Sequence, residues 1–347
     1  MRQWLISLVL CVCFCVSVGA VEYELPAPPA SVADLVPEEG ESFSQGLWNV
    51  IKGCVAHFSP SLAQASGVCM RILAVALLCS FIGRFSGKDT HWAVRLASVA
   101  AVGTVLLEPS AALMELGITT VRDLSEYGKL LLPVMTGALA AQGGGGTAAA
   151  LYGMTAFFDS VISSGICSLM IPMLYLFLGL SVGFAATGEM LLGKLRQLLK
   201  WMMQWVLKLS LYLFTGFLTV TGVVSGNADA AAMKAAKITI SGTVPVIGSI
   251  LSDASEAVLV GAGVMRSTVG VYGLITLAAL FLSPFVKLGA QYRLIKMTGG
   301  ICSALLKCGS AELVQDFAAA MGIVLAATAT QTVLLMISTV CLMKGVL

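Results

Sequence analysis

The chain has 347 residues, of which 58% are hydrophobic and 11% are charged, and its mean hydropathy is +0.94. This composition excludes a soluble globular fold and predicts an all-α protein that crosses a membrane several times. The formal net charge of +2 at pH 7 gives no indication of a nucleic-acid partner. In a membrane protein the position of the basic residues matters more than their sum.

Residues 1–20 have the features of a secretory signal peptide: Arg2, a short apolar run and small residues at the end. The alternative is an uncleaved first membrane helix, although the run is short for a span of about 20 residues. Residues 21–45 are acidic, rich in proline and without a basic residue, which predicts a flexible extracytoplasmic segment. Residues 46–347 are predicted to form the polytopic membrane domain.

Within this domain we interpret six apolar stretches as full membrane spans. Three clusters of basic residues, around Lys88, Lys200 and Arg293, lie between them. The positive-inside rule places all three clusters in the cytoplasm, and the order of the spans agrees with this placement. The predicted spans are 67–83, 93–107, 166–186, 209–224, 270–286 and 317–342.

Residues 108–129 mix charged and apolar residues at helical spacing, which predicts an amphipathic helix on the outer side. Two stretches, 130–164 and 237–273, are predicted to form broken or re-entrant hairpins. Proline lacks a backbone donor and disfavours helix at the residue before it, and broken backbone at membrane depth must face protein or water. The residues expected to mark the breaks and their close packing are Pro133, Gly137, Pro245 and Gly248.

Short motifs in the two hairpins resemble each other. Leu132-Pro133-Val134-Met135 corresponds to Val244-Pro245-Val246-Ile247, and a Tyr-Gly pair follows each of them. The segments 67–186 and 189–342 are therefore candidate parallel repeats, related by an axis along the membrane normal. Coincidence in an apolar, glycine-rich chain is the alternative.

The sequence contains no recognisable catalytic motif, no CxxC pair and only two isolated histidines. We therefore expect no enzymatic activity, no metal and no cofactor. Ionisable residues close to apolar segments mark ion pathways or pairs in membrane proteins. The candidates for a polar pathway or a partner surface are Asp159, Asp253, Glu256 and Arg266. For Asp253 and Glu256, simple exposure on the outer side explains the sequence equally well.

The second hairpin and the span after it hold an ordered set of short motifs. They are Pro245-Val246-Ile247-Gly248, Asp253-Ala254 with Glu256, Val269-Gly270, Gly273, Ser283-Pro284, Lys287 and Tyr292. This set, together with a signal peptide, an extracytoplasmic segment and a polytopic domain in that order, resembles the stage III sporulation protein AE family of endospore-forming bacteria.

The resemblance implies a membrane subunit of the channel-like complex that links the mother cell and the engulfed forespore. It places the chain in the mother-cell-derived cell membrane, as part of a conduit or its scaffold. Other membrane subunits of the complex, membrane lipid and further copies of the chain are the expected partners. The alternative is a stand-alone secondary transporter or permease, for which broken helices at paired positions are the expected sign.

Overall fold

The computed structural model describes residues 27–29, 32, 43–85, 91–139, 145–220, 268–305 and 309–344. Within these ranges all regular structure is helical and there is no strand, so the predicted all-α fold is confirmed. Five of the described helical segments are long and apolar enough to cross a membrane. This agrees with the prediction of a polytopic membrane protein.

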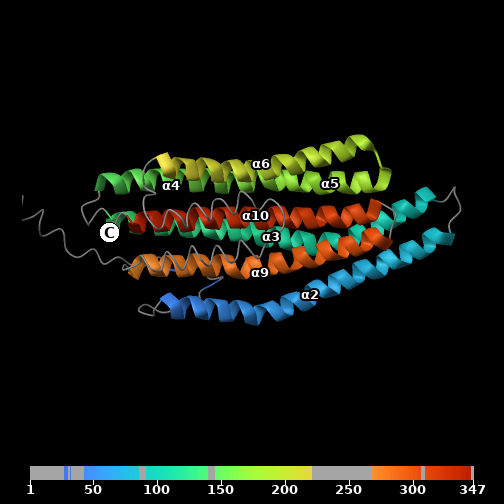
Figure 1. Ribbon diagram of the computed structural model, residues 1–347, viewed down its shortest axis with the longest axis horizontal. Coiled ribbons are helices and arrows are strands. Elements are labelled where there is room, and N and C mark those ends of the chain that lie inside the picture. Colours follow the sequence, from blue (N-terminus) through green and yellow to red (C-terminus); the bar gives the residue numbers. More distant parts are fainter. Residues whose placement is uncertain are drawn as a thin grey trace, which may run out of the picture.

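The helices run along one common axis in alternating directions (Figure 1). The rod formed by α4, η4 and α5 continues from residue 145 to residue 187 without a gap. In chain order the elements are α2 (Phe43–Phe85), α3 (His91–Leu139), α4 (Gly145–Gly165), the π-helical turn η4 (Ile166–Met170), α5 (Ile171–Thr187), α6 (Met190–Val220), α9 (Thr268–Leu305) and α10 (Gly309–Lys344).

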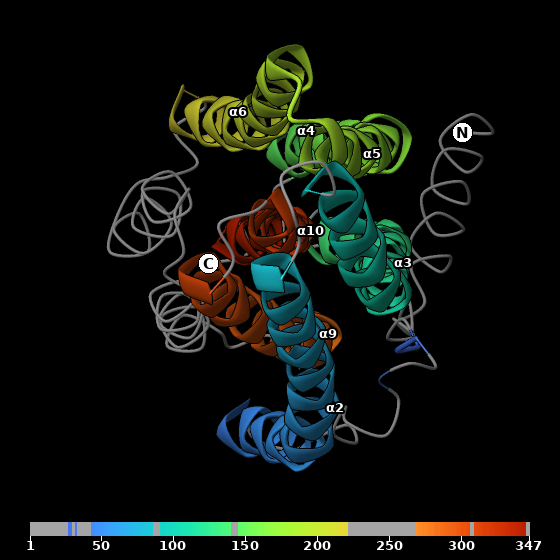
Figure 2. The ribbon, with the colours of Figure 1, turned by 90° about the vertical axis from the view of Figure 1, so that its right-hand side faces the viewer.

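Helix α10 is the centre of the bundle. It packs against α3, α9 and α5. In the most apolar 18-residue stretch of α10, 83% is buried, compared with 22% in the corresponding stretch of α2. Figure 2 shows α3 and α9 beside α10, α2 outside α9, and α4, α5 and α6 on the opposite side. A helix that is apolar or small on all sides is typical of such a buried position.

Glycines permit close approach between these helices. A Cβ atom added at Gly128 of α3 would lie 2.7 Å from Leu335 Cδ2 of α10, and one added at Gly309 would lie 2.5 Å from the carbonyl oxygen of Ala185. Real Cβ atoms do not approach other atoms so closely. A larger residue at Gly309 would therefore push α10 away from the backbone of α5, while one at Gly128 would force the Leu335 side chain to move.

The candidate membrane helices are longer than the predicted spans. Residues 92–137 of α3 form one candidate segment of 46 residues, where the sequence predicted a short span, a separate amphipathic helix and the start of a hairpin. At 1.5 Å per residue such a helix is about 70 Å long, more than twice the roughly 30 Å of a bilayer core. The predicted span 209–224 extends beyond the described residues, so the total of six stays a prediction.

The predicted helix break at Pro133 is wrong. Pro133 lies inside α3, which continues to Leu139, and the rod from α4 to α5 begins at Gly145. Residues 130–139 and 145–164 therefore belong to two long helices, α3 and α4.

Tertiary packing explains why α3 continues through the proline. A proline in a helix interior costs about 3 kcal/mol, because one hydrogen bond is lost and the ring crowds the preceding turn. Leu131, Leu132 and Met135 are no more than 2% exposed and share a core with residues of α9 and α10. In a membrane such contacts stabilise through close van der Waals packing, and proline is tolerated in a membrane helix that is supported by its neighbours. Pro133 itself is exposed, and Gly137 is half-buried one turn later.

The described parts of the basic clusters gather toward one end of the bundle. Arg95 lies at the start of α3, Lys200 in the first half of α6 and Arg293 in the second half of α9. Because these helices alternate in direction, all three positions point to the end where α5 meets α6 (Figure 1). The arrangement fits the predicted topology, and the cytoplasmic orientation of that end stays a prediction.

Several predictions concern residues outside the described ranges, namely the signal peptide 1–20, most of the acidic segment 21–45, and the second hairpin with Pro245, Gly248, Asp253, Glu256 and Arg266. Since the second hairpin lies there, the internal duplication also stays a prediction.

Candidate functional site

A cluster of polar side chains lies at the junction of α3, α4 and α10. Asp159 of α4 is 2% exposed. Its Oδ2 accepts a hydrogen bond from Ser125 Oγ of α3 at 3.2 Å, and its Oδ1 accepts one from Gln331 Nε2 of α10. We call Ser125, Asp159 and Gln331 the polar triad. Each occupies a core-facing position of its helix, so polar groups stand where apolar side chains would ordinarily pack.

The Asp159 carboxylate has no ion-pair partner among the described residues, where the recorded ion pairs are those of Arg196. Lys129, one turn beyond Ser125 on α3, acts on Asp159 electrostatically. The Lys129 side chain is exposed, however, and its charge remains outside the bundle. A buried carboxyl group without a cation is costly to stability unless hydrogen bonds compensate it, as Ser125 and Gln331 do in part.

The triad also contains a buried acceptor without a donor. Gln331 Oε1 has no hydrogen-bond partner among the described residues, although Gln331 is fully buried. The nearby hydroxyls of Thr328 and Thr332 donate to carbonyl oxygens of their own helix. They therefore cannot supply the missing donor.

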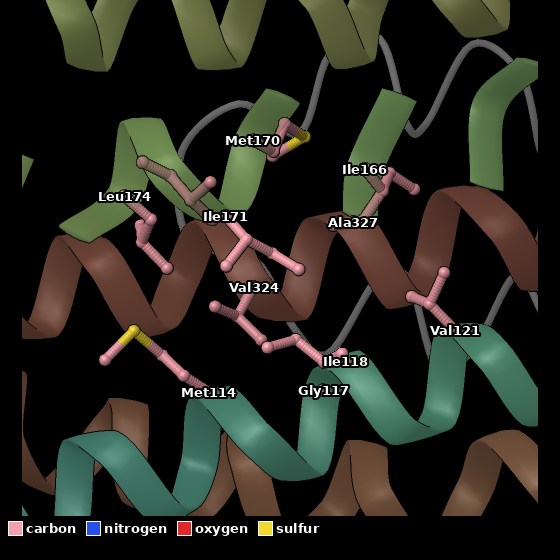
Figure 3. Close-up of a pocket in the computed structure, with 11 residues that line it drawn as sticks. Met114, Gly117, Ile118, Val121, Ile166, Met170, Ile171, Leu174, Val324 and Ala327 are labelled. Carbon is pink, nitrogen blue, oxygen red and sulfur yellow. The ribbon is translucent and has the colours of Figure 1, made fainter. Parts of the chain in front are cut away.

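An apolar cavity lies further along the same seam, between α3, α10 and the stretch formed by η4 and the start of α5 (Figure 3). Val121 lies one turn from Ser125, and Ala327 lies one turn from Gln331, so the cavity and the triad are neighbours along the seam. The π-helical turn η4 contributes to the wall, and π-helical turns are frequent at functional sites. The lining residues are Met114, Gly117, Ile118, Val121, Ile166, Met170, Ile171, Leu174, Ile323, Val324 and Ala327.

The register of α9 against α10 follows from a close contact at Gly322. A Cβ there would lie 3.0 Å from the ring of Tyr292, so these residues are level along the bundle axis. The triad residue of α10 lies nine residues further on, and Ser283 lies nine residues back on the antiparallel α9. The triad is therefore level with the apolar stretches 270–286 of α9 and 317–342 of α10.

Helix α6 also has an apolar stretch at the level of the triad. Phe158, beside Asp159, packs edge-on against Phe214 of α6, with ring centroids 5.6 Å apart. The apolar part of α6 that begins at Leu209 is thus level with the triad as well. Apolar stretches of α6, α9 and α10 share this level, which favours a hydrocarbon core there. The predicted spans 93–107 and 166–186 lie nearer the end of the bundle where Arg95 contacts Ala185.

The outward face of α3 is charged at this same level. Arg122 and Lys129 flank the triad residue Ser125 in sequence, and both are exposed. Outward residues of neighbouring helices are apolar here: Phe157 and Val161 of α4 are 59% and 50% exposed, and Leu213 of α6 is 56% exposed. The charged face of α3 consists of Glu108, Glu115, Arg122, Glu126 and Lys129, all exposed and at spacings of three, four or seven residues.

A second polar centre holds the opposite part of the bundle together. Arg196 of α6 pairs with Asp316 of α10 and, at 3.4 Å, with Glu312. Its guanidinium also lies 4.3 Å from the centroid of the Phe184 ring of α5. The Arg196 and Asp316 side chains are only 11% and 13% exposed, so this pair joins three helices in a mostly buried setting.

The end of α5 is fixed beside this pair. Arg95 Nε of α3 donates to the carbonyl oxygen of Ala185 at 2.9 Å, where a cation complements the negative end of the helix dipole. Gly188 has φ +75° and its N–H donates to the carbonyl oxygen of Phe184, which is the left-handed C-cap that glycine favours.

Of the predicted site residues, Asp159 lies in the triad, while Asp253, Glu256 and Arg266 are outside the described residues. No feature of the sequence joins Asp159 to Ser125 or Gln331, which lie 34 and 172 residues away. Gln331 could have been singled out from the sequence, because it is a strongly polar residue within the apolar predicted span 317–342.

Comparison with known proteins identifies the family. The family described as Stage III sporulation protein AE matches residues 32–345. A relative of the same name from Bacillus subtilis (strain 168) is 23% identical over 185 residues, which are 53% of this chain and 46% of that protein. The match thus covers less than half of that relative. No solved structure matches the chain. Because the family match extends over nearly the whole sequence, this chain belongs to the stage III sporulation protein AE family and has a role in sporulation.

Proposed function

We propose that this chain is an integral membrane subunit of the channel-like complex that connects the mother cell and the engulfed forespore. It lies in the mother-cell-derived membrane and contributes part of the conduit or its scaffold. Other membrane subunits of the complex, membrane lipid and further copies of the chain are its partners. Family membership supports the sporulation role, and the family description names no reaction.

The charged face of α3 is the observation that carries this proposal. Glu115, Arg122, Glu126 and Lys129 all lie within about 15 Å of Ser125 along the helix axis, which is half the thickness of a bilayer core. A charged side chain at the centre of a membrane helix costs about 2.5–3.5 kcal/mol in lipid. The cost falls toward the interfaces, so Arg122 and Glu126, which lie within one turn of Ser125, would bear most of it. This face therefore meets water or another protein subunit, as expected in a larger assembly.

We expect the double variant Glu115→Leu/Arg122→Leu to enter the membrane but to assemble poorly. Membrane entry should persist because an apolar face is compatible with lipid. Association with the other subunits should weaken by about tenfold or more, because two polar contacts of about 1 kcal/mol each are lost. The measurement is co-purification of other membrane subunits, together with spore yield, in a spore-forming strain that lacks its native copy. Val161→Leu, on an outward apolar position of α4, is the matched control. Wild-type co-purification and spore yield in the double variant would contradict the proposal.

A stand-alone secondary transporter is the second candidate, and the buried Asp159 favours it. Ionisable side chains at mid-membrane depth inside a helical bundle are typical of ion-coupled transport. Solute uptake by the purified chain in lipid vesicles, without any other sporulation protein, would favour this alternative over a subunit of a complex.

A further inference from the structure

We propose that the charged face of α3 docks onto the outward face of α6 in a second copy of the chain. This docking rests on the proposed function, in which the face of α3 meets water or protein, and it names a second copy as that protein. We call Glu108, Ala112, Glu115, Thr119 and Arg122 the α3 stripe, and Lys194, Trp201, Trp205, Lys208 and Tyr212 the α6 stripe.

Both stripes are open to a partner. Every residue of the α3 stripe is exposed, and Trp201, Trp205 and Tyr212 of the α6 stripe are 58%, 50% and 49% exposed. Among the described residues the recorded ion pairs are those of Arg196, which belongs to neither stripe. Helices α4 and α5 lie between α3 and α6 (Figure 2), so the two stripes meet only between different copies.

The two stripes lie at the same level of the bundle. Ser125 of α3 and Phe214 of α6 mark the level of the polar triad, through the hydrogen bond and the ring contact described above. The two helices run in the same direction (Figure 1), and Ala112 and Trp201 each lie 13 residues before these anchors. Copies that share one orientation in a membrane are related by rotation about its normal, which keeps residues of equal level opposite each other.

Charges of opposite sign then face each other. Lys208 lies six residues before Phe214 and Glu115 lies ten residues before the anchor of α3, a difference in level of about 6 Å. Lys194 and Glu108 lie 20 and 17 residues before their anchors, which is a smaller difference. The flexible four-carbon stem of lysine can span such an offset, so each glutamate of the α3 stripe receives a lysine.

The aromatic residues of the α6 stripe also find suitable partners. Trp201 and Trp205 stack with ring centroids 6.2 Å apart, and the small Ala112 is level with Trp201, which permits close approach. Tyr212 is level with Arg122 to within one residue, and an arginine over an aromatic ring is a favourable pair when water is excluded.

The same charges disfavour a symmetric contact of either stripe with itself. In a two-fold pair about the membrane normal, Glu115 would lie opposite Glu115 of the other copy, and Lys208 opposite Lys208. Like charges placed opposite each other weaken association strongly. The contact therefore joins two different faces, and repetition of such a contact closes a ring when the rotation permits it.

The first test uses the purified full chain in lipid vesicles, without any other sporulation protein. Two differently tagged forms of the chain are mixed, and benzoylphenylalanine replaces Trp201 in one of them. Illumination should join the two tags, and mass spectrometry should place the bond near Ala112 of the other copy. Benzoylphenylalanine at position 157, an aromatic and 59% exposed position of α4, is the matched control and should react with lipid.

Charge reversal gives a second readout that a general loss of folding does not reproduce. Glu115→Lys and Lys208→Glu should each lower the cross-linked fraction by about tenfold or more, because a like-charge pair replaces an attraction. The double variant Glu115→Lys/Lys208→Glu should restore it. Arg293→Glu, at an exposed position of α9, should leave it unchanged.

Three results would overturn the docking of α3 on α6. They are adducts of position 201 with lipid alone, a bond between copies that does not involve α3, and a double charge reversal that is no better than the single ones. If the purified chain forms no cross-link while Glu115→Leu/Arg122→Leu still loses the other membrane subunits in cells, the docking of two copies is wrong and the proposed function stands.

Discussion

Replacing Arg196 by leucine is expected to destabilise the bundle by about 3–5 kcal/mol, because the Asp316 carboxylate would stay buried without its cation. The two side chains are 11% and 13% exposed, so water screens the pair poorly. The variant also loses the contact between the guanidinium and the Phe184 ring, which adds to the effect. Unfolding of the purified chain in detergent measures the loss.

Two further variants separate the buried pair from its exposed neighbour. Glu312 is 54% exposed and lies 3.4 Å from Arg196, so Glu312→Gln should cost less than about 1 kcal/mol. The double variant Arg196→Leu/Asp316→Leu should recover most of the loss, since a well-packed apolar pair can replace a buried ion pair. Equal melting temperatures for Arg196→Leu and Glu312→Gln would show that the pair with Asp316 does not hold α6 to α10.

The second large effect is expected at the polar triad. Gln331→Leu removes a donor from the buried Asp159 carboxylate, and the loss of a hydrogen bond to a charged group costs about 1.5–3 kcal/mol. Thr332→Val is the matched control on the same helix, because its hydroxyl bonds only to a carbonyl oxygen of α10. That control should change stability by less than about 1 kcal/mol.

The double variant Asp159→Asn/Gln331→Leu tests whether the two residues act together. In the Asp159→Asn background the side chain is neutral, so the additional cost of Gln331→Leu should fall below about 1 kcal/mol. Residues in one hydrogen-bond network show such coupling, whereas independent residues have additive effects. Strict additivity of the two substitutions in thermal unfolding would therefore argue against the triad.

The sequence predicted the class of the fold correctly because composition alone requires burial in a membrane. It predicted Pro133 incorrectly because local propensity was the only available signal there. A proline favours a break, but the packing of Leu131, Leu132 and Met135 against α9 and α10 involves residues that are distant in the chain. Tertiary packing of this kind routinely overrides local propensity.

The amphipathic character of residues 108–129 was visible in the sequence, and their helical structure is confirmed. The sequence could not tell whether the charged face meets the outer aqueous phase or lies at membrane depth. Contacts such as Gly128 with Leu335 establish the register of α3 against α10, and so the level of the charged face relative to the apolar stretch of α10. Asp159 was recognised from the sequence because it is an ionisable residue within an apolar segment. Its partners on α3 and α10 could be identified only from the fold.

We expect that the charged face of α3 does not face lipid in the assembled membrane. A photoreactive diazirine side chain at position 122 tests it, with the same group at position 161 of α4 as the reference, because Arg122 and Val161 are both exposed and close in level to the triad. After illumination of membranes from sporulating cells, mass spectrometry counts lipid adducts at each position. Abundant lipid adducts are expected at position 161 and few at position 122. Equal lipid labelling at the two positions would contradict it.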